Sequence, residues 1–248
     1  MGRPIGFSTG SLAKSDYRAA LSVLGKTGAK AVELSALREH ELAPLLQDLA
    51  GLDLSQFEHA SIHAPSRLID YTEEQLVSAL LPVAKAGYPI VVHADIITDD
   101  AAWKRLGRHL CIENMDKRKS RGRTWREIGE TFAVLPKARF CLDVAHARQI
   151  DPTMSETIQF LRHFGDRLEQ LHVSELDGNS KHNQLSYSGS LSIQSVRNYV
   201  PVDVPIILEH EAEPHELENH MTLMRRLMAP VIGMARSAGR LKCMKVLR

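Results

Sequence analysis

The sequence predicts an α/β fold, a single closed (β/α)8 TIM barrel, from two patterns that run through the chain. Eight short apolar runs begin at intervals of roughly 20 to 37 residues, and a segment with helical spacing of apolar residues follows each run. Parallel strands require such crossover helices. Seven of the eight runs end on Asp, Glu or His. Only a closed barrel brings all eight strand ends to one mouth, since an open sheet uses only the strands beside its switch point.

The eight runs are short and almost wholly apolar, which is typical of strands buried on both faces. They are PIGFS (4–8), AKAVE (29–33), ASIH (60–63), IVVH (90–93), LCIE (110–113), RFCLD (139–143), EQLH (169–172) and PIILE (205–209). The final residues are Ser8, Glu33, His63, His93, Glu113, Asp143, His172 and Glu209. Asp, Glu and His make up about one position in six, so this ending pattern points to an active site rather than to a simple strand boundary.

The segments between the runs have the apolar spacing and end signals of helices. Thr72 and Gln75 predict a capping box, Ser155 predicts a helix N-cap, and Gly28 predicts a helix C-cap. The predicted helices span residues 17–28, 38–52, 72–87, 101–106, 124–135, 155–165, 193–199 and 215–228. Residues 229–248 carry basic residues among Met and Leu, and they predict a C-terminal helical extension that covers the barrel or contacts another subunit.

Composition places the chain among ordinary globular proteins. With 248 residues, 44% of them hydrophobic and 25% charged, one barrel accounts for the whole chain, and we expect a single domain over 1–248. A net charge of +1 does not indicate a polyanionic partner, although it does not exclude nucleic acid. The three cysteines form no CxxC pair, and no stretch is long and apolar enough to span a membrane, so we expect a cytoplasmic protein.

The last four strand ends predict a metal site. Glu113, Asp143, His172 and Glu209 supply three carboxylates and one imidazole, a donor set that suits Mn²⁺, Mg²⁺, Co²⁺ or Zn²⁺. The absence of a thiol argues against a sealed structural zinc site. The alternative is that Asp143 and Glu209 form ion pairs with Arg or Lys side chains of neighbouring loops.

Further side chains are candidates for the same mouth. His146 follows Asp143 by three residues, which predicts a second metal ligand, a substrate contact or a helix cap. The other candidates for additional metal or substrate binding are Glu33, His63, His93 and His182. The loop MDKRKSRGRT is either a solvated charge run or a phosphate-binding loop, whose candidate ligands are Lys117, Arg118, Arg121 and Arg123.

The ordered motifs HAP, IENM, DVAHA, HVSE and ILE resemble the xylose isomerase-like barrel superfamily over residues 5 to 215. This superfamily contains sugar isomerases and epimerases and also endonucleases of the endonuclease IV type. The resemblance to ketose epimerases implies one divalent ion on the four predicted ligands, with Glu113 and Glu209 exchanging a carbon-bound proton and His146 orienting a sugar or sugar phosphate. Those epimerases place an arginine where this chain reads SELDGNSK.

The resemblance to endonuclease IV implies a trinuclear zinc cluster instead. His63, His93 and Glu113 would bind one ion, and His146 and His182 would complete the set. An aspartate ligand of that family is replaced by Ser180 or Lys181, and the loops are short for gripping a duplex. A metal-dependent isomerase or epimerase is therefore the leading hypothesis, a phosphodiester hydrolase is the second, and a sugar- or metal-binding barrel without turnover is the third. A homo-oligomer is compatible with all three.

Overall fold

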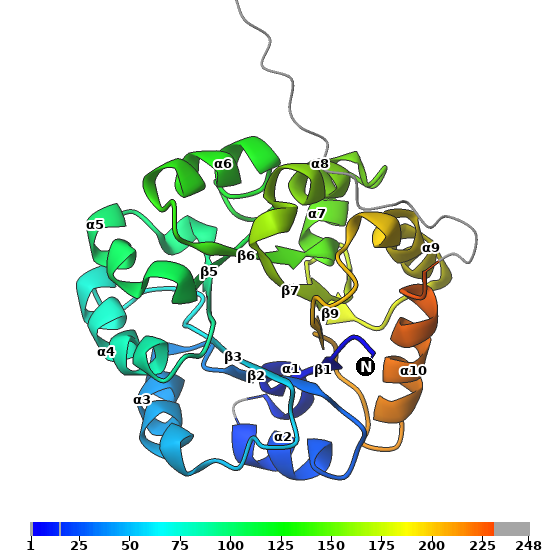
Figure 1. Cartoon of the computed structure of the whole chain (residues 1–248), viewed down its shortest axis with the longest axis horizontal. Helices are drawn as coiled ribbons and strands as arrows, with labels where there is room; N and C mark the ends of the chain where they lie inside the picture. The colour runs from blue at the N-terminus through cyan, green and yellow to red at the C-terminus, as the bar shows by residue number, and fades with distance from the viewer. Residues whose placement is uncertain (1, 15, 231–248) are drawn as a thin grey trace, which may run out of the picture.

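Eight parallel strands close into a barrel in the computed structural model, which describes residues 2–14 and 16–230 (Figure 1). The order around the barrel is β1, β10, β7, β6, β5, β4, β3 and β2, so each strand lies beside its predecessor among the barrel strands and the last closes on the first. The (β/α)8 TIM barrel predicted from the sequence is therefore confirmed. The strands are β1 (Ile5–Ser8), β2 (Ala31–Ser35), β3 (His59–His63), β4 (Ile90–His93), β5 (Leu110–Glu113), β6 (Arg139–Asp143), β7 (Leu168–Val173) and β10 (Ile206–Leu208).

Helices form an outer ring around these strands (Figure 1). Their apolar faces pack against the barrel, as the helical spacing of Leu76, Leu80 and Val83 in α4 illustrates. The helices are α1 (Thr9–Ala13), α2 (Tyr17–Leu24), α3 (Glu39–Asp48), α4 (Glu73–Lys85), α5 (Asp100–Trp103), α6 (Trp125–Val134), α7 (Val144–Ile150), α8 (Ser155–Phe164), α9 (Tyr187–Val196) and α10 (Leu217–Leu227). A small antiparallel ribbon, β8 (Glu175–Leu176) with β9 (His182–Asn183), lies in the loop after β7.

Several predicted helix boundaries differ from the structure, and α9 begins at Tyr187 rather than at residue 193. Helix α2 stops at Leu24 and its C-cap is Gly25 rather than Gly28, because the amide of Gly28 instead binds the Glu218 carboxylate of α10. Helix α8 takes its N-cap from Met154 in a left-handed conformation, so Ser155 is the first helical residue. The capping box of α4 on Thr72 and Gln75 is confirmed. Most of the predicted C-terminal extension, 231–248, lies outside the described residues.

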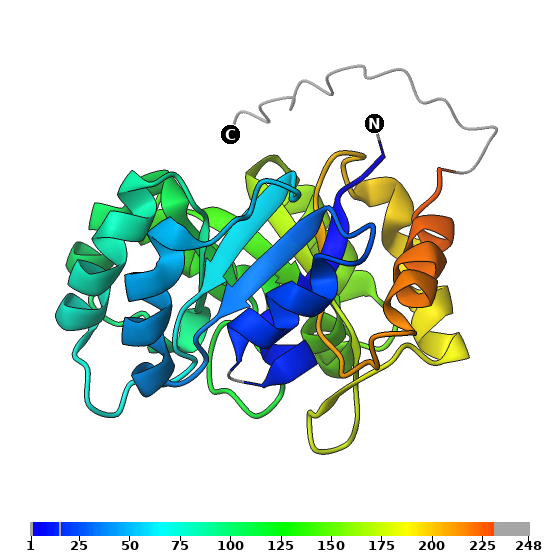
Figure 2. The ribbon, with the colours of Figure 1, turned by 90° about the horizontal axis from the view of Figure 1, so that it is seen from below.

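The strands run in one direction, so their carboxyl ends share one end of the barrel (Figure 2). Strand β2 continues two residues past Glu33, and Glu33 pairs in register with Ser61, two residues before the end of β3. Glu33 therefore lies one layer below the mouth, whereas His63 lies at the mouth. Within the described residues, no helix is long and apolar enough to cross a membrane.

Candidate metal centre

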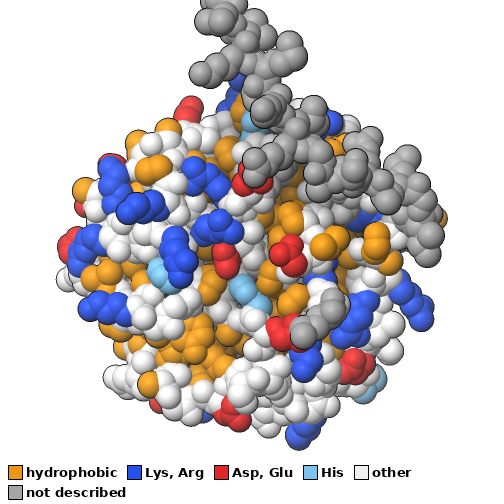
Figure 3. All heavy atoms as spheres, viewed as in Figure 1, with side chains coloured by type: hydrophobic (Ala, Val, Ile, Leu, Met, Phe, Trp, Pro, Cys, Tyr) orange, Lys and Arg blue, Asp and Glu red, His pale blue; other side chains and the backbone are white. Residues whose placement is uncertain are grey.

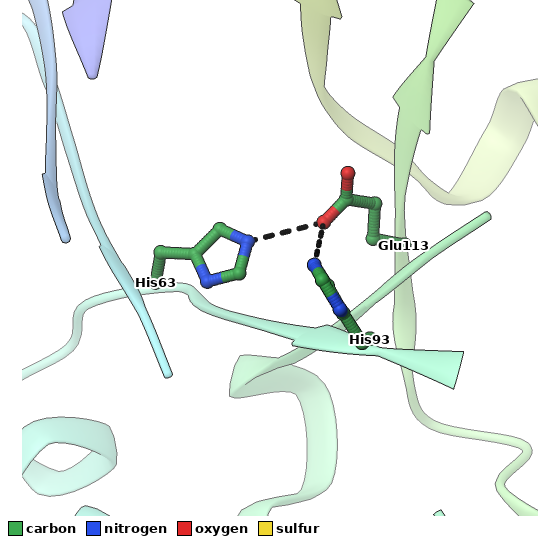
Figure 4. A group of neighbouring side chains, drawn as sticks. All are labelled: His63, His93 and Glu113. Carbon is green, nitrogen blue, oxygen red and sulfur yellow. Dashed lines mark hydrogen bonds and ion pairs between the residues drawn. The ribbon is translucent and has the colours of Figure 1, made fainter. Parts of the chain in front are cut away.

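Glu113 at the end of β5 is the centre of the site. Its side chain is 1% exposed, and its two oxygens face different imidazoles. Oε2 lies 3.1 Å from Nε2 of His63 and 3.4 Å from Nε2 of His93 (Figure 4). Oε1 lies 3.4 Å from Nδ1 of His172 and 3.4 Å from Nδ1 of His146. Glu113 can therefore bridge two cations, one on each carboxylate oxygen.

The four ligands predicted from the sequence come together on the second oxygen of Glu113. Nδ1 of His172 lies 3.3 Å from Oε2 of Glu209, which follows directly after β10. Asp143 ends β6, is fully buried, and caps α7 by accepting a hydrogen bond from the amide of His146 at 2.7 Å. One donor atom from each of Glu113, Asp143, His172 and Glu209 lies within 4.8 Å of the others.

Two further groups of donors meet the same distance criterion, namely His63 with His93 and Glu113, and Asp143 with His146 and His182. The rings of His146 and His182 are 5.6 Å apart between centroids, and Nδ1 of His182 lies 3.8 Å from Oε2 of Glu209. The predicted metal and substrate candidates other than Glu33 thus gather in three adjoining groups. Sequence spacing alone did not establish the group of Asp143, His146 and His182, because His182 lies in the long connection after β7 rather than at the end of a barrel strand.

Buried donor atoms without partners fit a cation at this site. Oδ2 of Asp143, Nδ1 of His172 and Nδ1 of His93 are buried and receive no hydrogen bond from the described residues. A buried polar atom without a partner costs about 1–3 kcal/mol, and more for a charged group. Carboxylate oxygens and imidazole nitrogens that converge in this way satisfy the donor preferences of Zn²⁺, Mn²⁺ and Co²⁺.

The shifted pKa values show how strongly these groups interact. Burial raises the pKa of Asp143 to about 7. Burial alone would also raise the pKa of Glu209, but the charge of His172 lowers it to about 2. Burial alone would lower the pKa of His63, but its hydrogen bond to Glu113 raises it to about 9. A proton on His63 thus balances the charge of the buried Glu113, and a metal ion has to displace such a proton, so metal binding strengthens as pH rises.

Glu33 is not a member of any donor group, and it supports His172 from below. Its Oε2 accepts hydrogen bonds from Nε2 of His172 at 3.0 Å, Nε2 of Gln170 at 2.7 Å and Oγ of Ser61 at 3.2 Å. Gln170 in turn bonds Nε2 of His59 at 2.8 Å. With Nε2–H donated to Glu33, the Nδ1 lone pair of His172 is directed to the metal position.

Sequence reasoning missed three polar residues around the donors. Asn114 is fully buried and holds the backbone of Asp143 through both amide atoms, at 3.0 Å to its carbonyl and 2.8 Å from its N–H. Asp116 is 2% exposed and lines the mouth. Gln170 lies two residues before His172 in β7 and therefore faces the same interior. A polar residue inside an apolar run was the available signal for Gln170.

Six of the donor residues line a cavity of about 370 Å³ at the barrel mouth, namely His63, His93, Glu113, His146, His182 and Glu209. Of the four predicted phosphate ligands, only Arg118 lines this cavity. Lys117 donates to the carbonyl of Gly178, Arg123 pairs with Glu127, and Arg121 is exposed away from the cavity, because a loop without regular periodicity directs successive side chains differently. Lys119 and Lys181 line the cavity in their place.

The electrostatic partners of the cavity cations differ. Oδ2 of Asp116 binds Arg118, and Oδ2 of Asp95 accepts from Nζ of Lys119 at 2.7 Å. Lys181 lies close to Asp177. The Asp177 carboxylate accepts a hydrogen bond from the backbone N–H of Lys181 at 2.9 Å and interacts with the charge of the Lys181 side chain. The alternative that Asp143 and Glu209 pair with Arg or Lys is not observed, since their partners in the described chain are imidazoles.

The chain is a (β/α)8 barrel whose strand ends bring carboxylate and imidazole groups together at the mouth, in three groups that could hold metal ions. No protein-family model and no curated protein sequence matches the chain. Solved structures do. Endonuclease IV from Thermus thermophilus superposes with a TM-score of 0.60 at 20% identity, over 91% of this chain and 98% of that one.

Two other solved structures show the same likeness. A sugar phosphate isomerase/epimerase from Parabacteroides distasonis gives a TM-score of 0.56 at 16% identity, over 93% of this chain and 95% of that one. A xylose isomerase domain containing protein from Salmonella typhimurium gives 0.59 at 13% identity, over 90% and 96%. The chain therefore shares the TIM-barrel fold of these solved structures, which is the fold that the resemblance of its motifs implied.

Proposed function

We propose that the chain is a divalent-metal-dependent enzyme that isomerises or epimerises a small sugar or sugar phosphate. The observation that carries this proposal is the convergence of two carboxylates on one imidazole. Oε1 of Glu113 and Oε2 of Glu209 lie within 3.4 Å of Nδ1 of His172, and both glutamates line a cavity of about 370 Å³. That volume lies in the range of small-molecule sites, about 300–1,000 Å³.

Glu113, Asp143, His172 and Glu209 would hold the ion, which would polarise the substrate carbonyl and hydroxyl oxygens. Glu209 is the more accessible glutamate, with 14% of its side chain exposed against 1% for Glu113. Because its carboxylate is the more accessible to a substrate, we assign to Glu209 the removal of the carbon-bound proton and to Glu113 the return of a proton. His146 and His182 would orient substrate hydroxyls, and Arg118 and Lys181 would bind a phosphate.

Exchange of a carbon-bound proton with D₂O tests this function directly. The protein loaded with Mn²⁺, Co²⁺ or Zn²⁺ is expected to incorporate deuterium into at least one ketose or ketose phosphate, as followed by NMR. Glu209→Gln is expected to lower the exchange rate by about 10²–10⁴-fold, the usual contribution of a general acid–base group. Glu211→Gln, at the rim of the same cavity, serves as the matched control. No exchange over a broad panel with metal bound would refute the proposal.

A second candidate is a phosphodiester hydrolase that acts on abasic DNA. The specific observation in its favour is the presence of three donor groups, of which two share Glu113 and two share Asp143. Metal ions bridged in this way stabilise both the attacking and the leaving oxygen of a phosphoryl transfer. One observation argues against this candidate. The aspartate that the resemblance to endonuclease IV implies just before His182 is absent, and Ser180 lies there, with its Oγ donating a hydrogen bond to Oε1 of Gln149 at 3.0 Å.

Metal stoichiometry separates the two candidates. The isomerase predicts turnover with one tightly bound ion per chain, and the hydrolase predicts three ions together with salt-sensitive cleavage of an abasic duplex. Elemental analysis of the purified protein, followed by both assays on the same preparation, gives a decisive comparison. The double substitution His63→Ala, His93→Ala removes two donors of the group that includes Glu113. It leaves the group of Glu113, Asp143, His172 and Glu209 intact. This variant should retain isomerase activity but lose hydrolase activity.

A further inference from the structure

The face opposite the metal centre carries two adjoining cavities. Figure 3 views this amino-terminal face, where Lys and Arg side chains gather over the α4, α5 and α6 side. The larger cavity, of about 450 Å³, is lined by Gly87, Pro89, Arg108, His109, Lys137, Arg139 and Glu169. The smaller, of about 240 Å³, is mainly apolar. Lys137 lines both, and the chain passes from one to the other at residues 107–110 and 135–139. We call the two together the amino-terminal cavity pair.

The larger cavity has an excess of positive charge. Arg139 pairs with Glu169 at 3.0 Å and donates to the carbonyl of Asp166 at 3.2 Å, which fixes its guanidinium. Arg108 and Lys137 are exposed, and neither has an acidic partner among the described residues. Two uncompensated cations beside a fixed arginine attract a dianion, and phosphate is the dianion whose oxygens match arginine donors.

The smaller cavity has an apolar lining that a phosphate alone would not use. Trp103, Leu110, Leu135 and Ala138 are its buried lining residues, and its exposed lining residues are Lys104, which pairs with Asp100, together with Pro136 and Lys137. The loop between α5 and β5 bends sharply at Gly107, which has φ of +58° and nothing within 4 Å of the position a Cβ would occupy. A cavity walled by such side chains favours a flat apolar group, which would gain about 25 cal/mol per Å² of apolar surface removed from water.

The loop that carries Lys137 is held in place by the fold. Arg167 donates to the carbonyls of Pro136 at 2.6 Å and Ala138 at 3.0 Å, so it fixes both neighbours of Lys137. A cavity whose loops are fixed before the ligand arrives costs less entropy to bind it. The position is also remote from the mouth, since the lining residues of the larger cavity precede or begin β4, β5, β6 and β7, whereas the metal donors of these strands lie at or next to their carboxyl ends.

We propose that the amino-terminal cavity pair is a second ligand site that binds a mononucleotide. The aromatic base occupies the apolar cavity, and the phosphate lies among Arg108, Lys137 and Arg139. The site is independent of the metal centre and of the reaction assigned to it, because its residues belong to the other end of the barrel.

Calorimetric titration of the full, metal-loaded chain with AMP tests this site, with adenosine and inorganic phosphate as separate probes. AMP is expected to bind at least tenfold more tightly than either probe, because only AMP fills both cavities. The variant Arg108→Glu with Lys137→Glu changes two exposed side chains and is expected to weaken AMP binding at least tenfold. Lys30→Glu places the same charge change on the same face outside the cavities and is expected to leave binding within twofold.

Three results would overturn the proposal. Absence of AMP binding to the unaltered chain is the first. The second is unchanged affinity in the Arg108→Glu, Lys137→Glu variant combined with loss of binding in Arg118→Ala, Lys181→Ala, which would assign the nucleotide to the metal mouth. The third is inorganic phosphate binding as tightly as AMP, which would show that the apolar cavity takes no part.

Discussion

Replacing Glu33 by Gln tests whether the proposed metal centre depends on a carboxylate that lies outside the three donor groups. Glu33 is fully buried, and its Oε2 accepts hydrogen bonds from His172, Gln170 and Ser61. Glutamine keeps the size of the side chain but removes the negative charge opposite the Nε2–H of His172. The imidazole then loses the partner that fixes its tautomer and raises the basicity of Nδ1.

The expected loss is a 10–100-fold weaker affinity for Zn²⁺ or Co²⁺, the usual effect of removing such a partner, which corresponds to about 1.4–2.7 kcal/mol. Chelator competition at pH 7 measures the affinity, and the visible spectrum of bound Co²⁺ reports the ligand geometry. Ser61→Ala is the matched control, since it removes one hydrogen bond to the same carboxylate without changing its charge, and a loss of about threefold or less is expected.

A Glu33→Gln chain that binds Co²⁺ with unchanged affinity and spectrum would refute this reasoning. Thermal unfolding of the metal-free variant provides the necessary separation of effects. If the metal-free variant unfolds at the temperature of the unaltered chain while metal affinity falls, the role is positioning. A general loss of stability with a normal Co²⁺ spectrum in the folded fraction would instead assign Glu33 to packing.

Three other predictions follow from the same geometry. Asn114→Ala should lower the free energy of unfolding by about 1–3 kcal/mol in urea titration, because it leaves the buried backbone of Asp143 without partners. Burial lowers the pKa of His210 to about 4, so the unfolded chain binds the extra proton below pH 6.5. Stability should therefore fall by up to about 3 kcal/mol between pH 6.5 and 4, and His210→Phe should abolish that part of the pH dependence. Arg118→Ala with Lys181→Ala should raise KM roughly tenfold for a phosphorylated substrate and leave KM unchanged for the unphosphorylated sugar, in steady-state assays.

The barrel and the principal donors could be predicted because both follow from strand periodicity. A parallel strand buried on both faces is an uninterrupted apolar run, and its last residue lies at the mouth, which places Glu113 and Asp143 without any tertiary information. Glu33 fails the same rule for a physical reason. Its strand continues through Leu34 and Ser35. Because serine is common in both strands and loops, the sequence did not predict that the strand ends two residues after Glu33.

The basic loop could not be resolved from the sequence, since side-chain direction in a loop depends on partners that are distant along the chain. Nζ of Lys117 donates a hydrogen bond to the carbonyl of Gly178, and an ion pair with Asp116 positions Arg118 at the cavity. Lys181 enters the cavity from the ribbon after β7, with no signal in its neighbours. Helix ends depend on the same kind of contact, as Gly28 shows through its bond to Glu218.

Because Glu113 belongs to two of the donor groups, substitutions at different donors have unequal consequences. Removing His63 and His93 would delete one ion position and leave every donor of the neighbouring position in place. Removing Glu113 would damage both at once. Under the proposed metal dependence, substitution of two histidines would therefore change the number of ions that the mouth can hold, whereas substitution of Glu113 would remove a donor that two groups share.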